Sequence, residues 1–375
     1  MTDEVTIIDA LQMKDVCFVD LRSEGEYAEG CIPGAVNIPL FTNQERARIG
    51  TVYKTVGPEA AKRLGLELAS PKLPEFFNQI GELVKDKKVL LYCWRGGMRS
   101  KYTTSILNTL GLPVSRIQGG YKAYRRFVHR YLERERIPHK VIVLHGLTGT
   151  GKTLLLHKLN RQFLPVLDLE TIAQHRGSAF GKIGLPASPS QKDFEAQIVQ
   201  RLMASEKQGV IITECESRRL GKLIVPPAVF NAMNGGYRVL LYASLPVRVK
   251  RIIEEYTDGS AENIQQLQYS TGLLKKSLGL KVVNDLSQKI AAKRFDEVIS
   301  YLLTHYYDPL YNYPDGPSQD YDLSVNCDDL DRAAIELAQW VTTRPEYRVP
   351  VESGGESYAD RGSFEECEDQ EGVFI

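Results

Sequence analysis

One eight-residue stretch, GLTGTGKT (146–153), constrains the fold of this 375-residue chain more than any other. It satisfies the pattern G-x-x-x-x-G-K-[ST] at every constrained position. It also lies between an apolar strand pattern, VIVLHG (141–146), and a helical pattern, KTLLLHKLNRQF (152–163). In that context the glycines let backbone amides wrap around an anion. The stretch therefore predicts a loop that binds phosphate or pyrophosphate at the end of a strand.

The loop and its neighbours supply the charged residues that phosphate chemistry requires. We predict Lys152 as a mobile cation and Thr153 as a ligand of Mg²⁺. The backbone cradle is expected at four positions: Gly146, Thr148, Gly149 and Gly151. An acid usually ends a neighbouring strand, and Asp168, Glu214 and Glu216 are the candidates, although each is alternatively an ordinary polar strand end. The pattern does not identify ATP as the ligand and does not predict hydrolysis.

Strand and helix patterns alternate in two series, which predicts two α/β domains with parallel sheets. The predicted strands are 16–21, 35–40, 88–93, 114–119, 141–146, 165–170, 209–217 and 238–245. The predicted helices are 59–69, 73–86, 99–110, 121–136, 152–163, 246–256, 285–304 and 329–343. We place the domains at 1–138 and 139–346, followed by an acidic, Gly/Ser-rich tail at 347–375 that is expected to be disordered.

A second loop, LLYCWRGGMRS (90–100), places a cysteine between a strand and a helix. The amides of the loop point toward Cys93, and Arg95 and Arg99 add positive charge. A helix amino terminus and nearby cations stabilise a thiolate, which is the nucleophilic form of cysteine. A buried inert cysteine is the alternative, but it needs neither the glycines nor the arginines. We therefore predict a reactive thiol beside an anion site.

Basic residues gather in two kinds of place. Arg176, Arg218 and Arg219 lie beside glycines in HRGSAFG (175–181) and ESRRLGK (216–222), as in loops that approach phosphates, with surface salt bridges as the alternative. Residues 95–140 carry eleven Lys/Arg against two Glu, although the whole chain has a net charge of zero. This stretch is either a solvated helix face or a surface for a polyanion.

The composition and the amino-terminal stretch also indicate the cellular compartment. The chain is 43% hydrophobic, and no apolar run approaches the ~18 residues that span a bilayer. Its amino-terminal stretch is acidic where a secretory signal is positively charged. The six cysteines have no metal-binding spacing, so we expect reduced thiols and no structural metal. We therefore expect a cytoplasmic protein without a membrane anchor.

The motifs together resemble a known family. FVDLRSEGEYAEGCIPGAVNIP (18–39), YCWRGGMRS (92–100) and GGYKAYR (119–125) resemble the signature, active-site loop and closing turn of rhodanese domains. One departure is that five residues separate Cys93 from Arg99, the spacing of cysteine phosphatases. A rhodanese-like domain followed by a P-loop NTPase-like domain, with LDLETIAQHRGSAFG (167–181) and ESRRLGKLIVP (216–226), is similar to the tRNA 2-selenouridine synthases.

The resemblance implies a reaction and its partners. Enzymes of that family replace the sulfur of wobble 2-thiouridine in tRNA with selenium from selenophosphate, after S-geranylation by geranyl diphosphate. It implies that the P-loop holds the diphosphate with Mg²⁺. It also implies that Cys93 acts as nucleophile or chalcogen carrier beside the phosphate ligand Arg99. The tRNA backbone would follow the basic surface, including Lys122, Arg125 and Arg126.

The residues that stack on the base and those that hold the geranyl chain stay open at this point. Base stacking by Trp94, Tyr121 and Tyr124 competes with aromatic core packing, and a geranyl groove at LIVPPAVF (223–230) competes with an ordinary core segment.

Two other functions remain open. One is a P-loop kinase or nucleotide hydrolase fused to a rhodanese-type phosphatase or sulfurtransferase, for which Tyr92 instead of His before the cysteine is unfavourable. The other is a non-catalytic binding module, which would not need Cys93 or the loop glycines.

Overall fold

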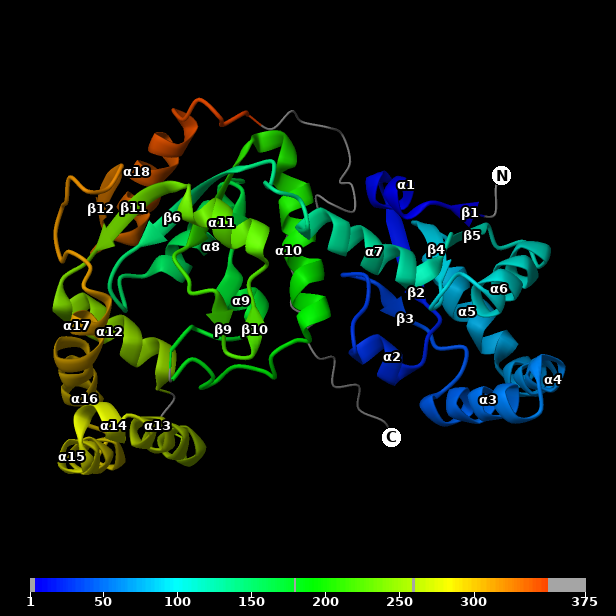
Figure 1. Ribbon diagram of the computed structural model, residues 1–375, viewed down its shortest axis with the longest axis horizontal. Helices are drawn as coiled ribbons and strands as arrows, with labels where there is room; N and C mark the ends of the chain where they lie inside the picture. The colour runs from blue at the N-terminus through cyan, green and yellow to red at the C-terminus, as the bar shows by residue number, and fades with distance from the viewer. Residues whose placement is uncertain (1–3, 179, 258–259, 350–375) are drawn as a thin grey trace. The chain divides into compact units, whose positions relative to one another are not determined.

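The computed structural model describes residues 4–178, 180–257 and 260–349. Within them the chain divides into two compact units, the first ending at His129 and the second beginning at Arg130 (Figure 1). Each unit is built on a five-stranded parallel sheet, as the alternating patterns predict. Most of the predicted tail, residues 350–375, lies outside the described residues. No helix in the described part of the chain has the length and apolarity needed to cross a bilayer.

The first unit has the strand order β1-β5-β4-β2-β3. Its strands are β1 (Glu4–Val5), β2 (Val16–Asp20), β3 (Val36–Asn37), β4 (Lys88–Tyr92) and β5 (Val114–Ile117). Its helices are α1 (Ile7–Gln12), α2 (Glu24–Ala28), α3 (Asn43–Thr55), α4 (Pro58–Ala69), η1 (Ser70–Lys72), α5 (Leu73–Leu83) and α6 (Met98–Thr109). Helix α7 (Gly120–Leu132) crosses the division between the units.

Side chains that alternate along β4 cover both faces of this sheet. On one face Leu91 packs with Ile80 of α5 and Leu107 of α6. On the other face the ring of Tyr92 lies 6.5 Å, centroid to centroid, from the ring of Tyr121 in α7. Burial of each such aliphatic side chain contributes roughly 1.5–3 kcal/mol. Helices therefore cover both faces and hold the carboxyl end of β4, where Cys93 follows, in a fixed place.

The second unit has the strand order β12-β11-β6-β8-β7. Its strands are β6 (Lys140–His145), β7 (Val166–Leu167), β8 (Val210–Glu214), β11 (Tyr237–Tyr242) and β12 (Leu323–Asn326), with a separate antiparallel pair of β9 (Arg219–Leu220) and β10 (Leu223–Ile224). Its helices are α8 (Lys152–Arg161), α9 (Leu169–Ala173), α10 (Gln191–Ser205), η2 (Glu206–Gln208), α11 (Pro227–Asn234), α12 (Leu245–Tyr256), α13 (Ala261–Leu273), α14 (Lys275–Leu278), α15 (Leu280–Ala291), α16 (Phe295–Leu302), η3 (Leu303–Tyr307), α17 (Asp308–Tyr311) and α18 (Leu330–Thr342).

Two groups of helices enclose the second sheet. Leu156 of α8 and Leu337 of α18 pack on Leu144 and Leu241 in one buried cluster, while α10 and α11 contact the sheet strands separately. Helices α12 to α17 gather at one end of the sheet (Figure 1) and form an apolar cluster of their own. The second unit therefore joins a P-loop sheet to a helical group.

Two predicted segments in this unit were wrong in detail. The predicted helix 285–304 is two helices, because Lys293 takes a left-handed conformation (φ +58°) between α15 and α16. The predicted strand 165–170 ends at Leu167, because Asp168 caps the short helix α9. Several elements of this unit were not predicted, the longest of them being α10, α13 and β12.

Candidate functional site

The first candidate site is the loop between β4 and α6, which carries Cys93. Its Sγ lies 3.2 Å from the Oγ of Ser100 in the first turn of α6. The thiol therefore lies near the positive end of the α6 dipole, as predicted from the sequence. Cys93 is 3% exposed, so only a small part of its surface is open to a reagent. Arg95 is exposed on the same loop.

The turn formed by Gly119 and Gly120 holds this loop in place. The amide of Tyr121 donates to the carbonyl oxygen of Cys93 at 2.9 Å, and the amide of Lys122 donates to that of Trp94 at the same distance. Gly120 has a φ of +57°, and a Cβ there would collide with the Cys93 carbonyl oxygen. The close approach therefore requires glycine, which explains the GGYK sequence after β5.

Arg99 is paired with a carboxylate that sequence reasoning did not single out. Its Nη1 lies 2.9 Å from the Oε2 of Glu26, whose other cationic neighbour is Arg46, with Nε at 3.6 Å. Burial is the largest single effect on Glu26 and favours its protonated form. The hydrogen bonds and positive charges around the carboxylate, first of all those of Arg99, together outweigh burial and hold the pKa of Glu26 below its ordinary value. These residues and Trp94 line a cavity of about 520 Å³. An anion entering it has to share Arg99 with Glu26.

Behind the loop, a buried arginine packs against aromatic side chains. Arg22 is fully buried, and its Nη2 donates to Asp20 at 2.5 Å and to the carbonyl oxygen of Gly30 at 2.7 Å. Its guanidinium lies 3.9 Å from the ring centroid of Tyr121. Tyr121 is therefore a packed core residue, as is Tyr124, which is 2% exposed. The structure thus favours core packing over base stacking for both tyrosines.

The second candidate site is the P-loop, which runs from the end of β6 into α8. Gly146, Gly149 and Gly151 all have positive φ angles, and a Cβ on Gly146 would collide with the carbonyl oxygen of Leu241. The Nζ of Lys152 donates to the Gly146 carbonyl oxygen at 2.9 Å, so the ammonium lies over the loop. The backbone therefore has the curved shape that the motif predicts.

Two arginines from α12 brace the P-loop from behind. The Nε of Arg248 donates to the carbonyl oxygen of Thr148 at 2.7 Å, and the Nη1 of Arg251 donates to that of Thr150 at 2.9 Å. Arg248 is 3% exposed and also pairs with Asp308. Sequence reasoning missed both arginines, because α12 follows the P-loop by about a hundred residues and only the fold brings them together.

Buried carboxylates lie beside the P-loop. The Thr153 hydroxyl donates to the Oε2 of Glu170 at 3.1 Å, and the Glu170 amide donates to the Oε1 of Glu214 at 2.9 Å. Burial, followed by repulsion from Glu216, raises the pKa of Glu170 to about 8. Burial also raises the pKa of Glu214, whose Oε2 is buried without a partner, and that of Glu216. Glu170 was missed, although it lies two residues after the candidate Asp168.

Asp168 has a different environment from these glutamates. It accepts a hydrogen bond from the amide of Thr171 at 2.8 Å as the cap of α9, and its Oδ2 lies 3.0 Å from the Nε2 of His157. The hydrogen bond to Asp168 raises the pKa of His157. Asp168 is therefore held by its own helix and by α8, and it is Glu170 that contacts Thr153.

The predicted arginines differ in whether they line the P-loop cavity. Arg176 lines the P-loop cavity, and its Nε lies 2.6 Å from the Oε1 of Glu255. Arg218 and Arg219 are exposed at the β9–β10 hairpin and do not line that cavity. On α7, Lys122 and Arg126 are exposed.

Arg125, also on α7, is half-buried. The segment 223–230 contributes Leu223, Val225 and Val229 to the core, so the core explanation holds there.

An oxygen-rich donor set surrounds the P-loop, but it is not a preformed metal site. Among the described residues, no three His, Cys, Asp or Glu side chains are arranged to hold a metal ion. The hydroxyl of Thr153 and the carboxylate of Glu170 already meet at 3.1 Å. Mg²⁺ prefers a few protein oxygens completed by phosphate and water, and this pair fits that preference.

Taken together, the two loops define an α/β protein that joins a thiol-bearing anion loop to a P-loop domain. A family model described as the tRNA 2-selenouridine synthase AAA domain matches residues 139–322, and the Rhodanese-like domain model matches residues 6–127. The tRNA 2-selenouridine synthase of Nitrosomonas europaea is 33% identical over 353 residues, which cover 81% of this chain and 90% of that protein. The chain therefore belongs to the tRNA 2-selenouridine synthase family.

The chain is also similar to a second curated protein and to one solved domain. The tRNA 2-selenouridine synthase of Hydrogenovibrio crunogenus is 34% identical over 333 residues, covering 81% of this chain and 91% of that protein. Among solved structures, the N-terminal domain of a putative ATP/GTP binding protein from Clostridium difficile 630 is 44% identical, with a TM-score of 0.33. That match covers 33% of this chain and 97% of the other.

Proposed function

We propose that this chain replaces the sulfur of 2-thiouridine at the wobble position of cytoplasmic tRNA with selenium. Geranyl diphosphate first alkylates the sulfur, and selenophosphate then supplies selenium. The observation that carries the proposal is that one chain of this family holds two loops of the kind that bind anions, one bearing Cys93 and the other Lys152. A diphosphate leaving group and a phosphate-bearing donor each require such a site.

In the first step the P-loop binds the diphosphate of geranyl diphosphate. The thiouridine sulfur attacks C1 of the geranyl group, so that a C–S bond forms, the C–O bond breaks and pyrophosphate leaves with the bonding electrons. The proton on N3 of the base passes to a carboxylate. Asp168, Glu214 and Glu216, the acids predicted beside the P-loop, are the candidates for this base, while Glu170 contacts Thr153. Lys152 stabilises the charge that develops on pyrophosphate.

Thr153 and Glu170 would hold Mg²⁺ together with the diphosphate oxygens. When bound, the ion would supply additional charge stabilisation to the leaving pyrophosphate. Arg248 and Arg251 hold the carbonyl oxygens of Thr148 and Thr150, so the loop amides keep their direction toward the anion. The protein thus contributes orientation and charge, and the chemistry at C1 needs no covalent enzyme intermediate.

In the second step selenophosphate binds at the Cys93 loop. Selenium attacks C2 of the base, the C–S bond breaks and the geranyl thiolate leaves, because a thioether is a better leaving group than a thiocarbonyl. The Cys93 thiolate then attacks phosphorus. The P–Se bond breaks toward selenium, and water hydrolyses the resulting phosphocysteine. A carrier role for Cys93 is less favourable, since removing neutral selenium from selenophosphate would leave phosphorus at the oxidation level of phosphite.

The direct test is mass spectrometry of nucleosides from 2-thiouridine tRNA incubated with the full chain. With geranyl diphosphate alone, S-geranyl-2-thiouridine should accumulate, and with added selenophosphate it should convert to 2-selenouridine. The alternative, a nucleotide hydrolase, predicts instead rapid ATP or GTP turnover without RNA and no modified nucleoside.

Binding of Mg²⁺ with diphosphate is expected to strengthen as the pH rises from 6 to 9. Glu170 is mostly protonated below its pKa of about 8, and a cation competes with that proton. Calorimetry at several pH values measures the effect, and Glu170→Gln should flatten the profile. Glu254→Gln, which changes a mostly exposed carboxylate on the same cavity, should leave it unchanged. An equally steep profile in Glu170→Gln would mean that a group other than Glu170 loses the proton when Mg²⁺ binds.

Affinity for tRNA should fall with salt, because α7 presents exposed cations. Replacing both Lys122 and Arg126 with alanine is expected to reduce the slope of log K against log salt by about 2, because each cation that is removed leaves one phosphate without a partner. Filter binding at several salt concentrations gives the slope. Alanine at Lys54 and Arg63, which are exposed on α3 and α4, is the control and should change it little. A salt-independent affinity would exclude a backbone-tracking surface.

A further inference from the structure

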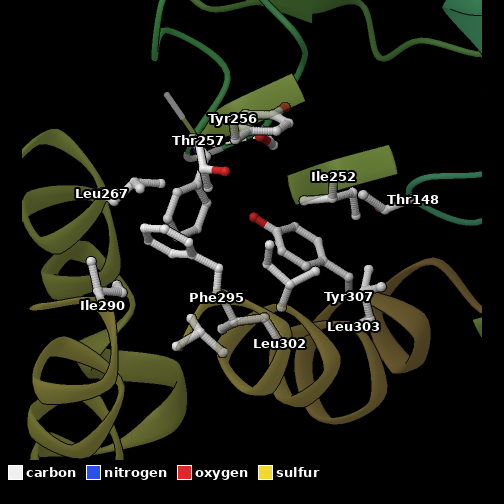
Figure 2. A pocket seen from close by; sticks show the side chains of 14 residues that line it. Thr148, Ile252, Tyr256, Thr257, Leu267, Ile290, Phe295, Leu302, Leu303 and Tyr307 are labelled. Atoms are coloured by element: carbon white, nitrogen blue, oxygen red, sulfur yellow. Dashed lines mark hydrogen bonds between the residues drawn. The ribbon is translucent and has the colours of Figure 1, made fainter. Parts of the chain in front are cut away.

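An apolar slot opens among the helices of the second unit. It is lined by residues from α12, α13, α15, α16 and η3, and in Figure 2 their side chains converge on a common space. The slot is narrow, with a cavity volume of about 60 Å³, and it is partly open to solvent. Leu267, Ile290 and Leu302, which contribute to its wall, are each at most 7% exposed. A slot of this kind within a helical cluster suits a flexible hydrocarbon and not a polar ligand.

The slot adjoins the P-loop cavity. Four residues line both of them: Thr148, Ser178, Ile252 and Tyr256. Thr148 belongs to the P-loop itself, and its carbonyl oxygen is held by Arg248 at 2.7 Å. In Figure 2, Thr148 and Ile252 lie at one side of the slot, and Leu267 and Ile290 lie at the opposite side. The phosphate site and the apolar space are therefore neighbouring cavities that share part of their walls.

The wall of the slot contains a local irregularity. The segment η3 (Leu303–Tyr307) is a turn of π-helix directly after α16, and both of its terminal residues line the slot. A π-helical turn is rare and shifts the side chains that follow it relative to a regular helix, and such turns frequently occur at binding sites. The helical cluster thus departs from regular geometry where the slot is formed.

We propose that this slot binds the hydrocarbon chain of an alkyl diphosphate whose phosphates occupy the P-loop. The proposal rests on the proposed function, in which the P-loop binds an organic diphosphate. The polar end of such a ligand meets Lys152 and the loop amides, and its apolar tail passes Ile252 into the slot. The buried side chains of Leu267 and Ile290 at the far end limit the length of the tail. The slot therefore selects the chain length.

Calorimetric titration of the full chain with Mg²⁺ and a series of diphosphates tests this assignment. The probes are inorganic, dimethylallyl, geranyl and farnesyl diphosphate. We expect geranyl diphosphate to bind at least about tenfold more tightly than inorganic diphosphate, because burying each methylene adds affinity. We also expect farnesyl diphosphate to gain nothing further, because Leu267 and Ile290 stand at the far end of the slot.

Leu302→Ala enlarges the slot and should raise the ratio of farnesyl to geranyl affinity about tenfold. Leu286→Ala is the matched control, since Leu286 is 1% exposed in the same helical cluster but is not among the residues that line the slot. It removes the same atoms from the same cluster, and the ratio should not change. An equal shift in both variants would mean general loosening of the helices and would overturn the proposal.

The remaining outcomes separate this inference from the proposed function. If inorganic and geranyl diphosphate bind equally well, the slot does not take the chain, while the P-loop assignment stands. If no diphosphate binds at all, the P-loop assignment fails, and the inference fails with it.

Discussion

Replacement of Lys152 by alanine is expected to lower geranyl transfer to 2-thiouridine tRNA by a factor on the order of 10² to 10³. The Lys152 ammonium lies over the P-loop, 2.9 Å from the Gly146 carbonyl oxygen. Negative charge grows on the pyrophosphate oxygens as the C–O bond breaks, so a fixed cation stabilises the transition state more than the bound substrate. Single-turnover formation of S-geranyl-2-thiouridine, followed by nucleoside mass spectrometry, measures the effect.

Lys158→Ala is the control for this experiment. Lys158 lies on the same helix, α8, and pairs with Asp331 instead of the loop. Its replacement removes a charge and a partly exposed ion pair, which typically costs 0 to about 1 kcal/mol of stability and should leave transfer nearly unchanged. Retained tRNA binding in both variants verifies folding. Undiminished transfer in Lys152→Ala would place the diphosphate outside this loop.

The two loops were predictable from sequence because each is a local motif. Glycines at fixed spacing and a strand–loop–helix context determine the backbone path of residues 146–153, and the same holds for residues 93–99. The partners of these loops were not predictable in this way. Arg248 and Arg251 reach the P-loop from α12, and Glu26 reaches Arg99 from α2. Such contacts depend on how separate elements pack, which local patterns do not encode.

The sequence also did not predict which carboxylate contacts Thr153. Asp168 ends the apolar run of β7 and was the natural candidate. In the structure its oxygens accept from Thr171 and contact His157, because Asp168 begins α9 as its cap. The helical turn then directs Glu170 toward Thr153. The strand ends three residues before its predicted end, and the carboxylate that meets the P-loop therefore lies two residues after Asp168.

The hydrophobic periodicity of the sequence did not predict the apolar slot either. Amphipathic patterns predicted α12 and the region of α15 and α16, but they did not reveal the break at Lys293. The pattern says which face of a helix is apolar, and it does not say whether facing side chains fill the space between helices. The slot depends on the combined packing of side chains from several helices, among them Leu267, Ile290 and Leu302.

Replacement of Cys93 by alanine or serine is expected to abolish 2-selenouridine formation, by at least about a thousandfold, while geranyl transfer continues. The P-loop reaction does not use the thiol, so S-geranyl-2-thiouridine should accumulate. Serine keeps the volume and the contact with Ser100 but lacks a nucleophile of comparable strength near neutral pH. The measurement is the ratio of the two modified nucleosides over time.

Cys17→Ala is the matched control, because Cys17 is a buried thiol of β2 in the same unit and should not affect selenium transfer. Selenophosphate labelled separately at phosphorus and at selenium distinguishes the two roles of the thiol. The proposed chemistry places labelled phosphorus on Cys93 in wild-type protein quenched during turnover, and no labelled selenium. Labelled selenium on Cys93 would establish a chalcogen carrier. Full selenium transfer by Cys93→Ala would remove the thiol from the reaction, because the neighbouring Ser100 hydroxyl is a much weaker nucleophile.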